Sequence, residues 1–201
     1  ASVTRQRQID PEQGMAWDAE VERNSHTPPP VDLSVSGYAG AYKHTKADAE
    51  IRDYAKRSCA EGRPVLKVAW DLITRIYDDF KFDATATDVS TPVSQVLRQR
   101  RGVCQDFSHL ALACLHALHL PARYVSGYIL TSPPPGGVKL AGADASHAWI
   151  SVWSPEHGWV DFDPTNGLMP KDEHIAIAYG RDYDDVSPIS GILLGGSEHS
   201  V

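Results

Sequence analysis

The sequence of 201 residues contains few cysteines, no long apolar run and little clustered positive charge. Its three cysteines, Cys59, Cys104 and Cys114, are odd in number and lack the paired spacing of zinc ligands, so neither a disulfide framework nor a zinc ribbon is expected. No segment approaches the roughly 18 apolar residues that cross a bilayer. The formal net charge of −7 opposes binding to nucleic acid or to anionic membranes, so we expect neither as a partner.

The remaining composition is that of an ordinary globular protein, with 42% hydrophobic and 22% charged residues. Reduced thiols suit the cytoplasm, and the first ten residues lack the apolar centre of a secretory signal, so we expect a cytoplasmic protein. Residues 1–45 contain a triple proline and several glycines, which indicate a mostly irregular N-terminal arm. Residues 46–201 are expected to form one core domain, and nothing indicates its oligomeric state.

Apolar periodicity predicts helices followed by strands. Helices are expected over 46–59, from Pro64 to about residue 80, after Thr91, and over 104–119. Strands are expected over 122–130, 147–153 and 158–163, with further candidates at 175–180 and 189–196. A short loop joins 147–153 to 158–163, as in a hairpin. Because helices precede strands without strict alternation, we predict an α+β fold with N-terminal helices packed on an antiparallel β-sheet.

Cys104 lies in the first turn of the predicted helix 104–119, shortly after Gly102. The backbone N–H groups of a first turn have no partner within the helix, and together with the helix dipole they stabilise a thiolate. Two polar residues follow Cys104, whereas Cys59 and Cys114 fit the description of small apolar core residues. Gly102 is expected to let another chain or a substrate approach closely. Cys104 is therefore a candidate nucleophile, which requires a base.

Nine histidines compete for the role of that base. A turn of about 100° per residue places His109 and His116 away from the apolar stripe of their helix, so both are expected to face solvent. A metal site formed with His119 would lack a carboxylate or a cysteine and is not favoured. Loops or chain termini are expected to contain His26, His44, His157, His174 and His199. The candidate that remains is His147, which opens a predicted strand.

The register of the predicted hairpin selects a carboxylate for His147. If Trp153 pairs with Trp159, the even-numbered positions of both strands form one apolar face. His147 and Asp163 then lie on the opposite face as diagonal neighbours, with their backbones about 7–8 Å apart across the strand pair. Asp163 is thereby favoured over Asp161, provided that no bulge shifts the register.

Each of these residues also has a structural alternative. A strand histidine can be a buried structural residue, and an aspartate before proline is typical of a turn. These alternatives weaken when the residues are taken together, because a thiol at a helix start, a strand histidine and a diagonal carboxylate are the parts of a Cys-His-Asp nucleophilic system. Cys104, His147 and Asp163 are therefore the predicted catalytic residues.

The two segments that contain these residues resemble the core of the bacterial transglutaminase-like, papain-related superfamily: GVCQDFSHLALACLHALHLPARYVSGY and SHAWISVWSPEHGWVDFDPTN. The resemblance covers about residues 60–180 and implies a papain-like α+β architecture, with the cysteine helix packed on an antiparallel sheet. It implies that Cys104 is the nucleophile, His147 the base and Asp163 the orienting carboxylate.

Two neighbours of the predicted nucleophile bear on this resemblance. Eukaryotic transglutaminases usually have Trp after the cysteine, whereas this chain has Gln105, which argues against transferring their substrate tunnel. Asp106 matches a family position, and we expect it to form hydrogen bonds within the core.

The predicted chemistry is acyl transfer through a thioester, on an amide or peptide bond of a peptide or protein substrate. Water as the acceptor gives a cysteine protease or amidase, which is preferred because nothing in the sequence marks an amine site. An amine acceptor gives a transglutaminase, and a noncatalytic binding module is the third hypothesis. We expect no cofactor and no metal, since the acidic run RDYDDV lacks the glycine and the terminal Glu of a calcium loop.

Overall fold

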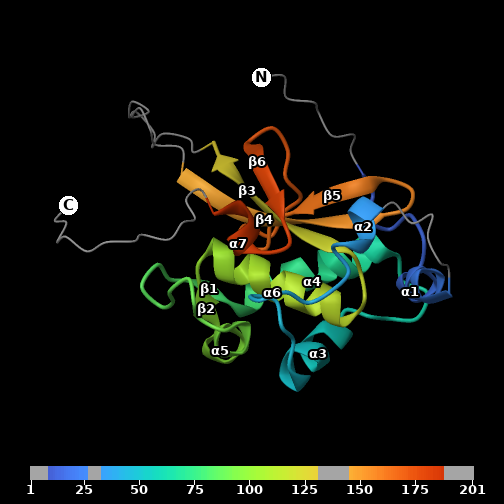
Figure 1. Ribbon diagram of the computed structural model, residues 1–201, viewed down its shortest axis with the longest axis horizontal. Helices are drawn as coiled ribbons and strands as arrows, with labels where there is room; N and C mark the ends of the chain where they lie inside the picture. Colours follow the sequence, from blue (N-terminus) through green and yellow to red (C-terminus); the bar gives the residue numbers. More distant parts are fainter. Residues whose placement is uncertain (1–8, 27–32, 131–144, 188–201) are drawn as a thin grey trace, which may run out of the picture.

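The computed structural model describes residues 9–26, 33–130 and 145–187 (Figure 1). Its elements follow in the order α1 (Trp17–His26), α2 (Leu33–Ser36), α3 (Ala49–Lys56), α4 (Val65–Asp79), β1 (Lys81–Phe82), α5 (Val93–Gln99), β2 (Arg101–Gly102), α6 (Cys104–Ala117), β3 (Ala122–Ile129), β4 (Ala145–Ser154), β5 (Gly158–Phe162), β6 (His174–Gly180) and α7 (Tyr183–Val186). The strand candidate at 189–196 lies outside the described residues. Within the described ranges, no helix combines the length and the hydropathy needed to cross a membrane.

Four antiparallel strands form the main sheet, in the order β5-β4-β3-β6. Trp153 pairs with Trp159, which confirms the predicted hairpin register. The even-numbered hairpin residues form an apolar face and are buried in the core: Ala148, Ile150, Val152, Val160 and Phe162. With helices covering this face, the predicted α+β class is confirmed.

Helix α6 is the centre of the molecule. It lies between the sheet on one side and α3 and α5 on the other (Figure 1), and it also contacts α4. Every residue from Asp106 to His116 is buried. A helix enclosed on all sides has no solvated face, so the assumption of a single apolar stripe fails for α6.

The prediction that His109 and His116 face solvent is therefore wrong. Each ring is buried with a hydrogen-bond partner, as burial of a polar group requires. Nε2 of His116 donates to the carbonyl oxygen of Ala122 at 2.9 Å, and Nε2 of His109 accepts from the backbone N–H of Tyr183 at 3.2 Å. These two histidines tie α6 to the start of β3 and to α7.

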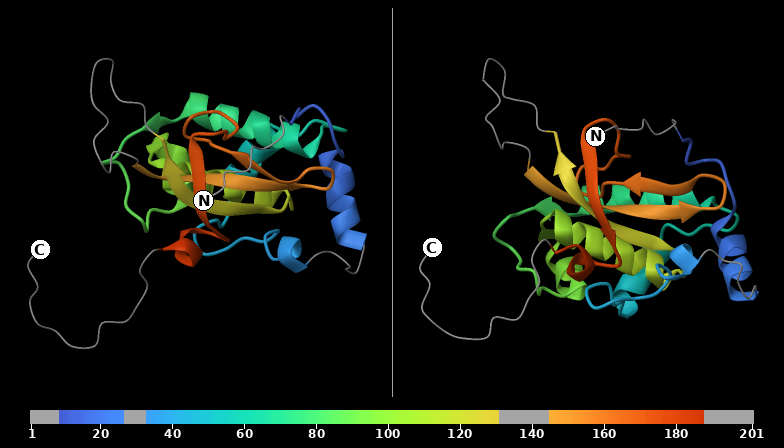
Figure 2. Two further views of the ribbon diagram at one scale, coloured as in Figure 1. Left: turned by 90° about the horizontal axis from the view of Figure 1, so that it is seen from above. Right: turned by 45° about the horizontal axis from the view of Figure 1, so that its top comes forward.

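The N-terminal arm contains α1, which the predicted irregular arm did not include. Figure 2 shows α1 near the turn between β4 and β5. Trp17 and Val21, four residues apart, place one side of this helix against the core. The indole N–H of Trp17 donates to the carbonyl oxygen of Ala60 at 2.9 Å. Tertiary packing thus stabilises a helix whose own apolar pattern is short.

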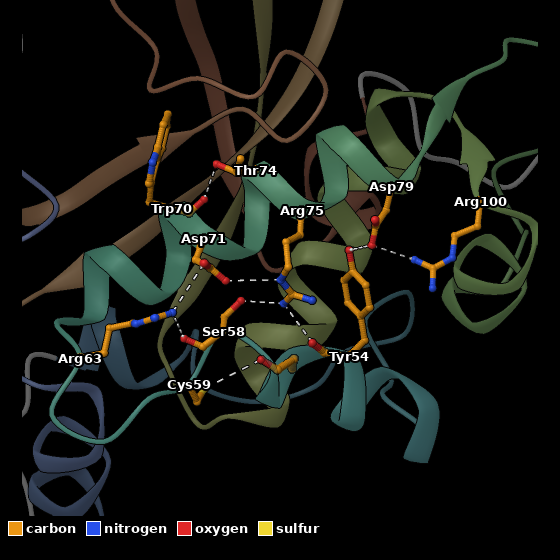
Figure 3. Close-up of polar contacts among 11 residues, drawn as sticks. Tyr54, Ser58, Cys59, Arg63, Trp70, Asp71, Thr74, Arg75, Asp79 and Arg100 are labelled. Atoms are coloured by element: carbon orange, nitrogen blue, oxygen red, sulfur yellow. Dashed lines mark hydrogen bonds and ion pairs between the residues drawn. The ribbon is translucent and has the colours of Figure 1, made fainter.

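Arg75 of α4 joins α4 to α3 (Figure 3). Its Nη2 donates to the Tyr54 carbonyl oxygen at 3.0 Å and to the Ser58 hydroxyl at 2.6 Å. The guanidinium also lies 4.4 Å from the centroid of the Tyr54 ring, whose hydroxyl donates to Asp79 at 3.0 Å. Both helices pack on α6, so this network supports the helix that contains Cys104.

Candidate active site

The segment that leads into α6 is held from two sides. Strands β1 and β2 pair in parallel, and the backbone N–H of Asp83 donates to the Gly102 carbonyl oxygen at 2.9 Å. The carboxylate of Asp106, in the first turn of α6, accepts from the Val103 backbone N–H at 2.7 Å and from the Thr87 hydroxyl at 2.6 Å. The expected hydrogen bonding of Asp106 within the core is therefore confirmed, and it fixes the turn that contains Cys104.

Gly102 makes this arrangement possible. A Cβ atom at this position would lie 2.6 Å from Oδ2 of Asp106, which is closer than real contacts allow. A close approach was predicted at Gly102, and the group that makes it in the structure is the Asp106 carboxylate of the same chain. Burial raises the pKa of Asp106, although its hydrogen bonds from Thr87 and Val103 oppose the shift.

The three thiols differ in their surroundings. Burial raises the pKa of Cys59 to about 11 and that of Cys114 to about 12, so both remain neutral thiols near pH 7. Cys104 is partly exposed, and its interaction with the His147 ring helps to raise the pKa of that ring. Partial exposure and a neighbouring imidazole are surroundings in which a thiol can react, whereas burial keeps Cys59 and Cys114 in the neutral form.

His147 and Asp163 come together across the hairpin as diagonal neighbours. His147 lies in β4, and Asp163 follows the last residue of β5. Nε2 of His147 donates to Oδ2 of Asp163 at 2.8 Å, with the histidine side chain 8% exposed and the carboxylate fully buried. Asp161 has another partner, because its Oδ2 accepts from the indole N–H of Trp149 at 3.1 Å. The structure thus places Asp163, and not Asp161, on the His147 ring.

Charge and hydrogen bonding determine the protonation state of this pair. Burial alone would lower the pKa of His147, but its hydrogen bonds with Asp163 and Cys104 outweigh burial and raise the pKa to about 9. Burial would raise the pKa of Asp163, yet hydrogen bonds from His147 and His174 hold it well below its usual range. Near neutral pH the pair is an imidazolium and a carboxylate. Since Asp163 occupies Nε2, the ring nitrogen that remains for the thiol is Nδ1.

Asp163 accepts hydrogen bonds on both oxygens. Oδ1 accepts from the backbone N–H groups of Thr165 and Asn166, at 2.9 and 3.2 Å. Oδ2 accepts from the Asn166 side chain at 2.7 Å and from Nε2 of His174 at 2.9 Å, in addition to His147. Asp163 therefore both forms the turn and bonds to His147. The two roles that the sequence allowed for it, turn residue and partner of the histidine, are compatible. His174 and Asn166 were missed by sequence reasoning, although His174 directly precedes the predicted strand 175–180.

Trp149 covers the side of this cluster. Its ring lies 6.1 Å from the His147 ring at an interplanar angle of 28°, and it meets the edge of His174 at 5.2 Å between centroids. A Cβ atom at Gly127 would lie 2.6 Å from the indole, so glycine in β3 is required for Trp149 to lie across the sheet. The indole therefore lies on one side of the imidazole.

The same side chains offer three possible metal ligands. Ligand atoms of His147, Asp163 and His174 lie within 4.8 Å of one another. Both ring nitrogens concerned, however, bond to the same carboxylate oxygen, which also accepts from Asn166. A hydrogen-bonded cluster accounts for these contacts, and we assign it no metal.

Comparison with known proteins decides the family. The sequence model of the Transglutaminase-like superfamily matches residues 52–164. The chain belongs to this superfamily. The matched segment of this transglutaminase-like chain extends from α3 to the residue after Asp163, and it includes Cys104 and His147. The predicted family is thereby confirmed.

Individual relatives differ in what they cover. An uncharacterized protein of Mycobacterium tuberculosis is 48% identical over 155 residues, which are 75% of this chain and 49% of the relative. A protein-glutamine gamma-glutamyltransferase of Pseudomonas aeruginosa is 33% identical over 95 residues, 47% of this chain and 12% of the transferase. The chain thus spans about half the length of the mycobacterial relative.

One solved structure shares the fold over most of the chain. It is that of a protein of Cytophaga hutchinsonii proposed to be a cysteine protease, and it matches with a TM-score of 0.64 at 27% sequence identity. The match covers 82% of this chain and 54% of the Cytophaga protein. The helices and antiparallel sheet described above are therefore those of a transglutaminase-like, cysteine-protease-like domain.

Proposed function

We propose that this chain is a cysteine-dependent acyl-transfer enzyme that hydrolyses amide or peptide bonds through a thioester. The observation that carries the proposal is the His147 ring, which lies beside the Cys104 thiol and is held at Nε2 by the buried Asp163. The carboxylate thus holds the ring by a hydrogen bond, and the ring interacts with the thiol, as a nucleophile, a base and an orienting carboxylate require. Cys104, His147 and Asp163 are the proposed catalytic residues.

The proposed reaction has two halves. With the thiol proton already on Nδ1 of His147, the Cys104 sulfur attacks the carbonyl carbon of the substrate to form a tetrahedral intermediate. The C–N bond then breaks as His147 returns the proton to the leaving amine, and a thioester remains on Cys104. Water attacks the thioester while His147 accepts its proton, and the carboxylic acid product leaves as the thiol is restored. Asp163 keeps the ring oriented throughout.

The first turn of α6 supports the charged intermediate. Backbone N–H groups at a helix start are directed at a developing oxyanion, and one such donor contributes about 3–4 kcal/mol in comparable sites. The backbone N–H of Cys104 is our proposed donor. No cofactor takes part in these steps.

Transfer to an amine is the reaction that competes with hydrolysis. Hydrolysis agrees with the likeness to the Cytophaga protein and needs no second substrate site. Transfer to an amine agrees with the likeness to the Pseudomonas protein-glutamine gamma-glutamyltransferase. To separate them, the chain is incubated with a peptide mixture, with and without a primary amine, and the products are weighed by mass spectrometry. Cleaved peptides support hydrolysis, whereas amine adducts without cleavage would replace it with transglutamination.

A noncatalytic binding module is tested by the reactivity of the thiols. Iodoacetamide near pH 7 is expected to alkylate Cys104 rapidly, and to spare Cys59 and Cys114 because their pKa values of about 11 and 12 keep them neutral. Peptide mapping identifies the alkylated residue, and Cys104→Ala is the control. A native Cys104 no more reactive than Cys59 and Cys114 would support a binding module instead.

We further propose a peptide or protein as the substrate partner and a cytoplasmic location. All three cysteines are free, which agrees with a reducing compartment. Fractionation of cells that produce the natural protein tests the location, and recovery outside the cytoplasm would contradict it.

A further inference from the structure

We propose that His174 is a positioning residue for the reaction proposed above. It would hold the Asp163 carboxylate in the orientation that presents Oδ2 to the His147 ring. The inference rests on the proposed function and adds a fourth side chain to the three proposed catalytic residues. His174 acts through Asp163 and needs no contact with the substrate.

The contact comes from a separate part of the sheet. His174 is the first residue of β6, and β6 pairs with β3, whereas His147 and Asp163 belong to the β4–β5 hairpin. Nε2 of His174 donates to Oδ2 of Asp163 at 2.9 Å, and its side chain is only 3% exposed. The carboxylate is thus anchored from its own turn by Asn166 and from a different strand by His174.

The second ring nitrogen indicates which tautomer is present. Nδ1 of His174 is buried and has no hydrogen-bond partner among the described residues. A charged ring would bury an N–H donor at this atom without an acceptor, which is costly. We therefore assign the neutral tautomer with its proton on Nε2. Such a ring gives Asp163 a fixed hydrogen bond without bringing a second positive charge next to His147.

Both histidine rings donate to the same oxygen of Asp163. Among the described residues, the ionisable groups around the His147 ring are Cys104 from α6, Asp163 after β5, and His174 from β6. Asp161 is occupied by the Trp149 indole. Loss of His174 would leave Oδ2 with Asn166 and His147 alone, and the carboxylate free to turn toward its backbone donors. The His147 imidazolium would then be less stabilised by Asp163, and the charged form of the neighbouring thiol would be less stabilised by the imidazolium.

The test compares two variants. In His174→Gln the amide nitrogen replaces Nε2 as a donor, whereas His174→Leu keeps the bulk and has no donor. The rate of Cys104 alkylation by iodoacetamide is measured against pH. Cys104 in His174→Leu is expected to react about 10–100-fold more slowly near neutral pH, with the acid limb of its profile at higher pH. This range is taken from the loss of outer hydrogen-bond partners of metal-binding histidines. His174→Gln is expected to recover most of the rate.

The control is His157→Leu, in the exposed turn between β4 and β5, which should leave the profile unchanged. A wild-type profile in His174→Leu would overturn the inference. An equal loss of the alkylation rate in His174→Leu and His174→Gln would overturn it too. Nitrogen NMR of the unmodified protein tests it without any substitution, and a proton on Nδ1 of His174 would also overturn it. An unreactive Cys104 in the wild-type protein would instead overturn the proposed function.

Discussion

Replacing Asp163 with Asn tests how the His147 ring is held. The amide has one oxygen, which can remain with the backbone N–H groups of Thr165 and Asn166. Its NH2 group would then face Nε2 of His147, so that two donors meet. To relieve this, the ring must carry its proton on Nδ1, the nitrogen that faces the thiol. In that tautomer the ring cannot accept the thiol proton.

The size of the effect follows from the shift in the pKa of His147. The hydrogen bond and charge of Asp163 are the main reasons why this pKa rises from 6.5 to about 9 in a buried site. Without them, burial should bring it from about 9 toward 6.5, a change of at most about 3 kcal/mol at 1.36 kcal/mol per unit, because the interaction with Cys104 remains. An Asp-to-Asn change in a Ser-His-Asp triad lowers kcat by about 10⁴ through the same tautomer error. We expect alkylation of Cys104 near pH 7 to fall by roughly 100-fold.

Two measurements check this expectation, and one variant controls it. NMR titration of the histidine rings gives the pKa of His147, and the alkylation profile gives the reactivity of Cys104. Asp161→Asn is the matched control, because Asp161 bonds to Trp149 and not to His147. The reasoning is refuted if His147 in Asp163→Asn still titrates near 9, or if Asp161→Asn lowers the reactivity as much.

Three further predictions concern stability. The raised pKa of His147 stabilises the folded state. This contribution is complete below the unfolded pKa near 6.5 and is lost as the pH rises toward about 9. In urea unfolding, the wild type should therefore lose about 3 kcal/mol of stability over this interval relative to His147→Gln. A slope shared by both proteins would contradict it. Gly127→Ala should lower stability by about 1–3 kcal/mol in thermal unfolding, since its Cβ would lie 2.1 Å from the Ile175 carbonyl oxygen; an unchanged melting temperature would show that β6 can move away. Asp106→Ala should cost about 1–3 kcal/mol and slow alkylation of Cys104, because it leaves the Val103 N–H without its partner. Loss of stability with no change in alkylation would separate Asp106 from the site.

The parts of the fold that follow from local patterning could be predicted. The alternation of apolar residues in the hairpin permits one register only, because a slip by one residue would turn its apolar face to the other side. That register correctly placed His147 diagonal to Asp163. Prolines and glycines bounded the helix of Cys104 within two residues of its observed end.

The parts that depend on tertiary packing could not be predicted. The burial of His109 and His116 reflects the enclosure of α6, which no single helix reveals. His174 was expected in a loop, directly before the predicted strand 175–180. Its contact with Asp163 depends on how β6 pairs with β3, and sequence alone gives no strand order. Gly102 was correctly identified as a site of close approach, but the partner is a side chain four residues later.

Direct detection of the acyl-enzyme tests the central claim most sharply. A panel of peptide esters is mixed with the chain, and the reaction is stopped with acid. The protein is then digested, and its peptides are analysed by mass spectrometry. We predict an acyl group on Cys104, labile to hydroxylamine as a thioester is, and greatly reduced in His147→Gln. An acyl group on another residue, or equal acylation of Cys104 without His147, would contradict the account.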